Sequence, residues 1–158
     1  MLMISMHREP TFGFLVSDVA RMLRRVFDQR ARQIGLSLAQ ARALLYLARC
    51  EGINQACLAV LLEVQPISLA RLLDRMGAAG WIERRADPGD RRVHLLYLTD
   101  KARPLIDELQ RMSAETRADA LAGFSEAEKD MAMRLMTRVH GNLSVSVPGT
   151  DNQDGDDD

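Results

Sequence analysis

The sequence predicts a mainly α-helical protein with one small β-hairpin, on the strength of two observations. Apolar residues recur at spacings of three and four along most of the 158-residue chain, which is typical of amphipathic helices. Residues 81–86 and 93–98 are instead rich in strand-forming side chains and flank the turn-forming sequence Asp87-Pro88-Gly89-Asp90. Taken in order, the segments predict six helices and one hairpin.

The first predicted helix spans residues 12–35 and ends at Gly35. Its apolar stripe consists of Phe12, Leu15, Val19, Met22, Leu23, Val26 and Phe27. Ser37 and Gln40 then form a capping box that opens a second helix, because each side chain can satisfy the backbone amide of the other. We expect Gly52 to end this helix, and its buried face to consist of Ala41, Leu44, Leu45 and Ala48.

The next two helices are short and form a helix-turn-helix arrangement. Asn54 is a good N-cap for a third helix that runs through Leu62, and Pro66 opens a fourth with Gln65 as its cap. The fourth helix has two opposite sides. One side is expected to pack and carries Leu69, Leu73 and Met76. The other is expected to face a partner and carries Ser68, Arg71, Leu72 and Arg75.

The hairpin is formed by Trp81–Ala86 and Val93–Leu98. Pro88 fixes φ in the turn, and Gly89 is expected to supply a positive φ. Four arginines lie at the base and tip of this hairpin, namely Arg84, Arg85, Arg91 and Arg92. A helix that fits the major groove, followed by a hairpin that ends in guanidinium groups, can hold double-stranded DNA at two places.

The last two helices are long and apolar on one side. Thr99 is expected to cap the fifth, which continues towards Ala122 with a lost hydrogen bond or a bend at Pro104. Ser125 and Glu128 form a second capping box, which opens a sixth helix that ends before Gly141. The small helix-turn-helix unit cannot cover the stripes of the first, fifth and sixth helices. We therefore expect an intertwined homodimer, whose two-fold symmetry suits inverted repeats.

The charge of the chain is unevenly distributed. The net charge is −1, but five of the 22 acidic residues lie in the last eight positions, so residues 1–150 carry 21 basic against 17 acidic side chains, a balance of +4. Only Lys101 and Lys129 are lysines. The positive charge is therefore almost entirely guanidinium, which forks onto phosphates and base edges.

Several classes of protein are disfavoured by the sequence. The longest apolar run, residues 56–62, is too short to span a bilayer, and the start MLMISMHREP lacks the pattern of a signal peptide, so we expect a cytoplasmic protein without a membrane partner. No glycine loop for phosphate, nucleophile elbow or metal-ligand spacing is visible, so we expect neither an enzyme nor a cofactor or metal. Cys50 and Cys57 match no disulfide framework. We expect both to be small buried apolar residues, with a redox switch as the alternative.

The phrase LLDRMGAAGWIERRADPGDRRVHLLYLT, within the order of elements over residues 12–141, resembles the MarR family of winged helix-turn-helix regulators. The resemblance implies that residues 66–78 read DNA, with Gln65, Ser68, Arg71 and Arg75 at the major groove and Pro66 opening the helix. It also implies that the Asp-x-Arg pattern, met by Asp90-Arg91-Arg92, places an arginine in the minor groove and uses the aspartate to orient it. Members are homodimers that usually repress nearby genes and release DNA when a small aromatic or anionic ligand, or an oxidant, acts on them.

Three departures from the family pattern stand out. Glu63 occupies the helix-turn-helix turn where glycine is frequent, so a non-glycine residue has to accept an unusual φ. Ala41 replaces a frequent tryptophan, and Cys57 replaces a frequent acidic residue. Residues 1–35 contain no cysteine, whereas the hydroperoxide-sensing branch has its reactive thiol there, so ligand release is favoured over oxidant sensing through Cys50 or Cys57.

The resemblance also implies an effector pocket between the winged domain and the dimerisation helices. The candidate lining residues are His7, Phe12, Phe14, Arg42 and Tyr46, which can equally be ordinary core and surface residues. The predicted division is an N-terminal arm (1–11), dimerisation helices (12–35 and 99–143), a winged helix-turn-helix domain (36–98) and an acidic disordered tail (144–158). The remaining alternative is a winged-helix module that binds protein rather than DNA, which would not need four arginines on its hairpin.

Overall fold

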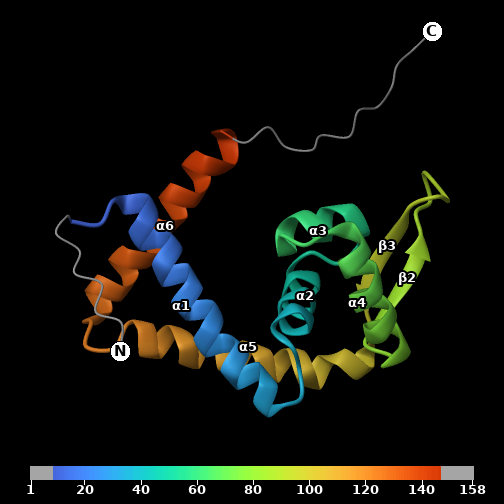
Figure 1. The fold of residues 1–158 in the computed structure, drawn as a ribbon, viewed down its shortest axis with the longest axis horizontal. Coiled ribbons are helices and arrows are strands. Elements are labelled where there is room, and N and C mark those ends of the chain that lie inside the picture. Colours follow the sequence, from blue (N-terminus) through green and yellow to red (C-terminus); the bar gives the residue numbers. More distant parts are fainter. Residues whose placement is uncertain (1–8, 147–158) are drawn as a thin grey trace, which may run out of the picture. The chain divides into compact units, whose positions relative to one another are not determined.

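The computed structural model describes residues 9–146, which contain six α-helices, one 3-10 turn and three short strands (Figure 1). The chain divides after Ala120 into two compact units, the second of which contains the last helix. The mainly helical fold with a hairpin wing is thus confirmed. In chain order the elements are α1 (Phe12–Gln33), α2 (Leu38–Arg49), β1 (Ile53–Asn54), α3 (Gln55–Leu62), α4 (Pro66–Ala78), β2 (Ile82–Ala86), β3 (His94–Leu98), η1 (Asp100–Ala102), α5 (Arg103–Ala120) and α6 (Glu126–Ser146).

The helix starts follow the capping signals of the sequence. The Ser37 N–H donates to Gln40 Oε1 (2.9 Å) and the Gln40 N–H donates to Ser37 Oγ (3.2 Å), which is the predicted capping box of α2. Asn54 Oδ1 accepts from the Cys57 N–H (2.8 Å) at the start of α3. At α6 the Ser125 N–H donates to Glu128 Oε2 (2.8 Å), and this hydrogen bond lowers the pKa of the Glu128 carboxyl.

The three strands form one antiparallel sheet in the order β1-β3-β2. β2 and β3 are the predicted hairpin, with Arg84 opposite Leu96 and Arg85 opposite Leu95. β1 was not predicted from the sequence. It pairs Ile53 with Leu96, and the Gly52 N–H donates to the Leu96 carbonyl (2.9 Å). The sheet is therefore attached to the chain segment that leads directly into α3.

The core of the first unit lies between α2, α3, α4, the sheet and the first half of α5. Its largest fully buried side chains are Leu44, Leu47, Leu58, Leu62, Leu69, Leu73, Met76, Leu96 and Leu109. The buried face of α2 differs from the prediction, because Ala43 and Leu47 are buried, Leu45 is half-buried and Ala48 is exposed. The helix is surrounded on several sides, so its buried face is wider than a single stripe.

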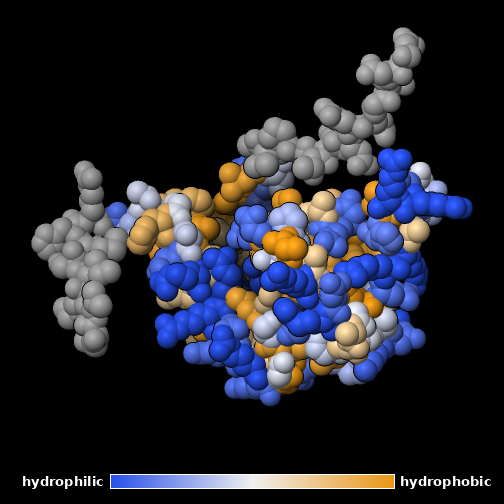
Figure 2. All heavy atoms as spheres, turned by 45° about the vertical axis from the view of Figure 1, so that its right-hand side comes forward, coloured by the Kyte–Doolittle hydropathy of each residue, from blue (hydrophilic) through white to orange (hydrophobic). Residues whose placement is uncertain are grey.

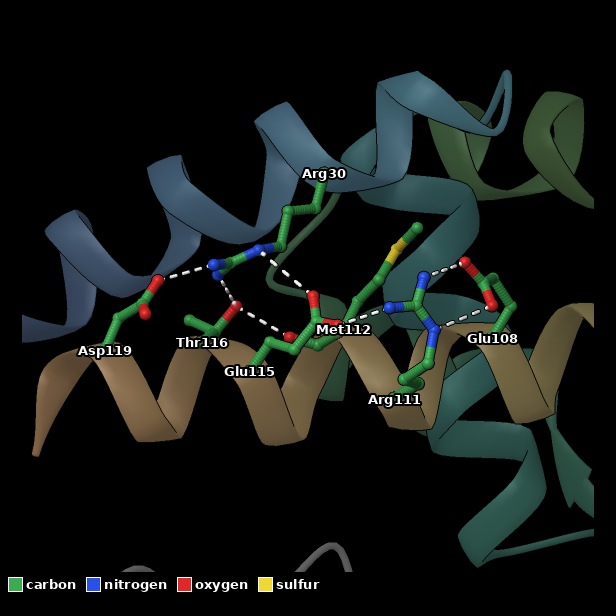
Figure 3. Close-up of polar contacts among 7 residues, drawn as sticks. All are labelled: Arg30, Glu108, Arg111, Met112, Glu115, Thr116 and Asp119. Carbon is green, nitrogen blue, oxygen red and sulfur yellow. Dashed lines mark hydrogen bonds and ion pairs between the residues drawn. The ribbon is translucent and has the colours of Figure 1, made fainter.

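A polar network holds α1 against α5 (Figure 3). The Arg30 guanidinium donates to Thr116 Oγ1 (2.6 Å), pairs with Asp119 and lies 3.7 Å from the Glu115 carboxylate. The Thr116 hydroxyl in turn donates a hydrogen bond to the Met112 carbonyl (2.8 Å). Because Phe27 and Ala31 are also buried on α1, this contact combines apolar packing with a charged clamp.

Predicted details of the last two helices are corrected by the structure. Thr99 precedes η1 rather than capping α5 directly, and its hydroxyl donates to the Gly80 carbonyl (2.5 Å). Pro104 is the second residue of α5, where the missing N–H belongs to the unpaired first turn and costs no interior hydrogen bond. α6 continues through Gly141 to Ser146, since one glycine lowers helix propensity without ending a helix. The predicted disordered tail (144–158) is wrong for residues 144–146, which belong to α6, and its remaining residues, like the first eight residues of the arm, lie outside the described residues.

Candidate nucleic-acid interface

Helix α4 presents the predicted polar side chains to solvent. Pro66 is its first residue and Gln65 is its N-cap by backbone position, although the Gln65 side chain makes no capping hydrogen bond. Ser68, Arg71 and Arg75 are exposed, as predicted. Within residues 9–146 the guanidinium groups of Arg71 and Arg75 make no ion pair or hydrogen bond. Both can therefore bind an external anion without first losing an internal partner.

The sequence prediction was wrong about Leu72, and the error shifts the exposed face. Leu72 is only 4% exposed and packs in the core with Leu69, Leu73 and Met76. At about 100° per residue, the side opposite these four leucine and methionine side chains is centred on residues 67, 71, 74 and 78, and positions 68 and 75 flank it. Ile67, which sequence reasoning missed, is 65% exposed at the centre of this face. Counting Leu72 among the apolar positions would have revealed it.

The turn before α4 contains a strained residue and an unexpected arginine. Glu63 adopts φ 57° and ψ 43°. This is the left-handed conformation that glycine usually adopts at such a turn, and it was expected for Glu63 from the sequence. Arg42 on α2 donates to the carbonyls of Leu61 (3.3 Å) and Leu62 (3.2 Å). These carbonyls end α3 and have no partner inside the helix. Arg42 thus fixes the turn from which α4 starts.

The wing is the hairpin of β2, β3 and the turn between them, and side chains of its own aspartates shape its tip. Asp87 Oδ1 accepts from the Gly89 N–H (2.8 Å), and Asp90 Oδ1 accepts from the Arg92 N–H (2.9 Å). Gly89 does not have a positive φ, so that expectation was wrong; these aspartate turns form the bend instead. The Asp90 carboxylate thereby fixes the backbone at Arg92.

The four arginines of the wing fall into two groups. Arg84 pairs with Asp74 of α4 (2.8 Å), and Arg85 pairs with Glu83 and lies over the Tyr97 ring (4.2 Å to its centre). Arg91 and Arg92 are exposed at the tip, and their guanidinium groups make no ion pair within the described part of the chain. Figure 2 shows strongly hydrophilic side chains projecting at this end of the molecule. Two arginines of the wing therefore stabilise it, and two are available to a partner.

The candidate effector residues are not brought to one place. Phe12 and Phe14 are exposed at the beginning of α1, about 22 Å along the helix from the buried Phe27. Arg42 and Tyr46 lie together on α2, with the guanidinium 6.0 Å from the ring centre, and α2 lies away from the start of α1 (Figure 1). His7 lies outside the described residues.

Other kinds of site find little support in residues 9–146. Cys50 and Cys57 are both exposed free thiols, so the expectation that they are buried was wrong. No group of three or more His, Cys, Asp or Glu side chains in this range is placed to hold a metal ion. No single helix of the same range is long and apolar enough to cross a membrane, and only α3 with α4, bent by 108°, would suffice in length and composition.

Comparison with known proteins defines the class. The model of the MarR family matches residues 34–93. A crystal structure of the transcriptional regulator PA3341 is 36% identical over 85% of this chain and 98% of that one, with a TM-score of 0.73. Wild-type MarR from E. coli in its apo form (22% identity, 84% of this chain, 98% of that one) and the regulator SlyA (23%, 87%, 96%) share the fold, with TM-scores of 0.75 and 0.71. The fold and the exposed basic side chains are those of a winged-helix transcriptional regulator. The chain belongs to the MarR family.

Proposed function

We propose that this protein is a homodimeric regulator that binds palindromic double-stranded DNA, with α4 in the major groove and the tip of the wing in the minor groove. The observation that carries the proposal is the division of the arginines. Arg71, Arg75, Arg91 and Arg92 are exposed without internal partners in the described residues, on the helix and the tip expected to meet DNA. Ser68, Gln65 and the Asp90-oriented backbone complete the proposed contact surface.

The homodimer is supported by apolar surface in both units of the chain. Exposed patches of this extent mark interfaces, and orange apolar residues remain visible at the surface in Figure 2. On α1 the exposed apolar residues are Phe12, Phe14, Leu15, Val16, Val19, Met22 and Leu23, and on α6 they are Met131, Met133, Leu135, Met136 and Leu143. The apolar stripe of α5, expected to need a partner, is instead buried within the first unit through Ile106, Leu109 and Met112. The exposed stripes of α1 and α6 therefore carry the proposal that residues 12–35 and 99–143 are dimerisation helices, which flank the winged domain of residues 36–98 in the sequence.

Release from DNA is proposed to follow binding of a small aromatic or anionic ligand, which makes the protein a repressor. Arg42 beside Tyr46 offers a cation and a ring for such a ligand, which would have to share the guanidinium with the carbonyls of Leu61 and Leu62. A second candidate is release by an oxidant, which the exposure of Cys50 and Cys57 favours. Both act on the same DNA-binding unit, and the cytoplasm is the proposed location in either case.

Salt dependence of binding tests the core of this proposal. Each phosphate that an arginine neutralises releases counterions, with a slope of about −0.9 in log affinity against log salt. Four partner-free arginines per protomer set the steepest slope for a dimer at about −7. Fluorescence anisotropy with a duplex selected from a random pool should therefore show a steep loss of affinity between low and high salt. Affinity that does not change with salt, or no preference over random duplex, would reject the proposal.

A further inference from the structure

Ile67 is a large apolar side chain that lies mostly outside the core of its unit. It is the second residue of α4 and is 65% exposed, whereas the other large apolar residues of the same helix are all buried. Isoleucine is among the residues most often found inside proteins. The side chain contributes little to the packing of this unit, and its surroundings on the helix indicate a role at the surface.

The surroundings of Ile67 are those of a reading surface. Ile67 and Arg71 lie at the centre of the exposed face and are separated by one turn, which places their Cβ atoms about 5–6 Å apart. Asp74, the next residue of this face, is occupied by its ion pair with Arg84 (2.8 Å). The first two turns of α4 therefore present one apolar group beside one partner-free guanidinium.

The chemistry of the major groove gives this pair of side chains distinct targets. Thymine is the base that exposes an apolar group there, the C5-methyl, while guanine offers two acceptors that suit arginine. An isoleucine can make no hydrogen bond to a phosphate or to a base edge, so a contact with DNA that stabilises binding must be apolar. The first residues of a recognition helix are also those that reach base edges.

We propose that Ile67 packs against the C5-methyl group of a thymine in each half-site and is a specificity-determining residue of this protein. The proposal rests on the proposed function, because it requires α4 to enter the major groove. It adds a requirement that arginines and serine alone do not impose: the operator carries thymine at one symmetric position close to the base pair that Arg71 contacts.

Replacement of thymine by deoxyuridine tests the proposal, because it removes only the methyl group and leaves base pairing intact. A duplex is first selected from a random pool with the full-length protein, and each thymine is then replaced in turn. At one position, loss of the methyl should weaken binding about four-fold, and about sixteen-fold when it is replaced in both half-sites. Ile67→Ala should bind the thymine duplex correspondingly less well and should no longer distinguish it from the deoxyuridine duplex.

Two further variants make the result specific to Ile67. Ile67→Val keeps a branched apolar side chain and should retain most of the discrimination. Val60→Ala is the matched control, because Val60 is 67% exposed but lies on α3, and it should leave the discrimination unchanged. Equal melting temperatures are expected for all three variants, since both positions are exposed.

The outcomes separate this inference from the proposed function. Selective, salt-dependent binding without any deoxyuridine effect, or with the same effect in Ile67→Ala, would overturn the role of Ile67 and leave the regulator intact. Loss of discrimination in Val60→Ala instead would move the methyl contact to α3 and overturn it too. If no duplex is selected at all, both proposals fall, and the exposed apolar residues of α3 and α4 belong to a protein-binding surface.

Discussion

Arg92→Ala is expected to weaken duplex binding far more than Arg84→Ala, although both arginines belong to the wing. Arg92 is exposed and has no ion pair within the described residues, so a contact with DNA replaces only water. Arg84 is paired with Asp74 at 2.8 Å, and a DNA contact would first have to break that pair. The comparison therefore tests whether internal pairing decides which arginines bind.

The expected magnitudes differ clearly. Loss of the Arg92 contact should cost about 1–3 kcal/mol per protomer, and the salt slope of a dimer should become shallower by about 2. An exposed ion pair such as that of Arg84 contributes about 0–1 kcal/mol to stability, so Arg84→Ala should mainly loosen the wing. Anisotropy titrations at several salt concentrations measure both quantities. Circular dichroism and sedimentation check that helix content and the dimer are unchanged.

Two results would refute this reasoning. Arg92→Ala could bind as tightly as the parent protein with the same salt slope, which would show that the tip does not contact DNA. Alternatively, Arg84→Ala could lose as much affinity and slope as Arg92→Ala. In that case ion pairs seen in the free protein do not indicate which side chains remain internal.

Three further predictions concern reading, stability and control. Arg71→Ala and Ser68→Ala should lower the ratio of specific to random affinity at fixed salt, because base edges carry the sequence code; a proportional fall in both affinities would assign these residues to the backbone. Glu63→Gly should raise the melting temperature by a few degrees, since the left-handed conformation costs about 1–2 kcal/mol for a residue with a Cβ. The greater conformational entropy that glycine loses on folding offsets part of this gain. A lower melting temperature would mean that Glu63 is not strained. The double substitution Cys50→Ser with Cys57→Ser should leave release by aromatic anions in place, as measured by anisotropy, and loss of every response would favour the thiol mechanism instead.

Local signals in the sequence predicted the helices well. Ser37 with Gln40, Asn54 and Ser125 with Glu128 all cap helices as expected, because each signal acts over three residues. The exposed arginines of α4 followed from an equally short pattern, whereas the left-handed Glu63 followed from the family resemblance, in which glycine is frequent at this turn. Gly89 was the exception, since the aspartate side chains of the turn took over the role assigned to the glycine.

Features that depend on distant parts of the chain were not predicted. β1 is only two residues long and exists through its pairing with β3, more than 40 positions later. The cap that Arg42 provides to α3 spans 20 residues, and the pair of Arg84 with Asp74 spans 10. Sequence patterns placed Arg84 at the surface but could not show that its guanidinium is paired with Asp74. The same limit applies to Leu72, whose burial depends on what surrounds α4.

The wing is tied to the rest of the winged domain at three points: β1 pairs with β3, the Thr99 hydroxyl holds the Gly80 carbonyl at the end of α4, and Arg84 holds Asp74. The spacing between α4 and the tip of the wing is therefore fixed by the fold. The distance along a duplex between the base pairs that these two parts contact is fixed with it. One base pair inserted between these two segments would advance the duplex by about 3.4 Å and turn it by about 35°. A hairpin held at three points cannot follow such a displacement. Operators of this protein should therefore tolerate no inserted base pair within a half-site.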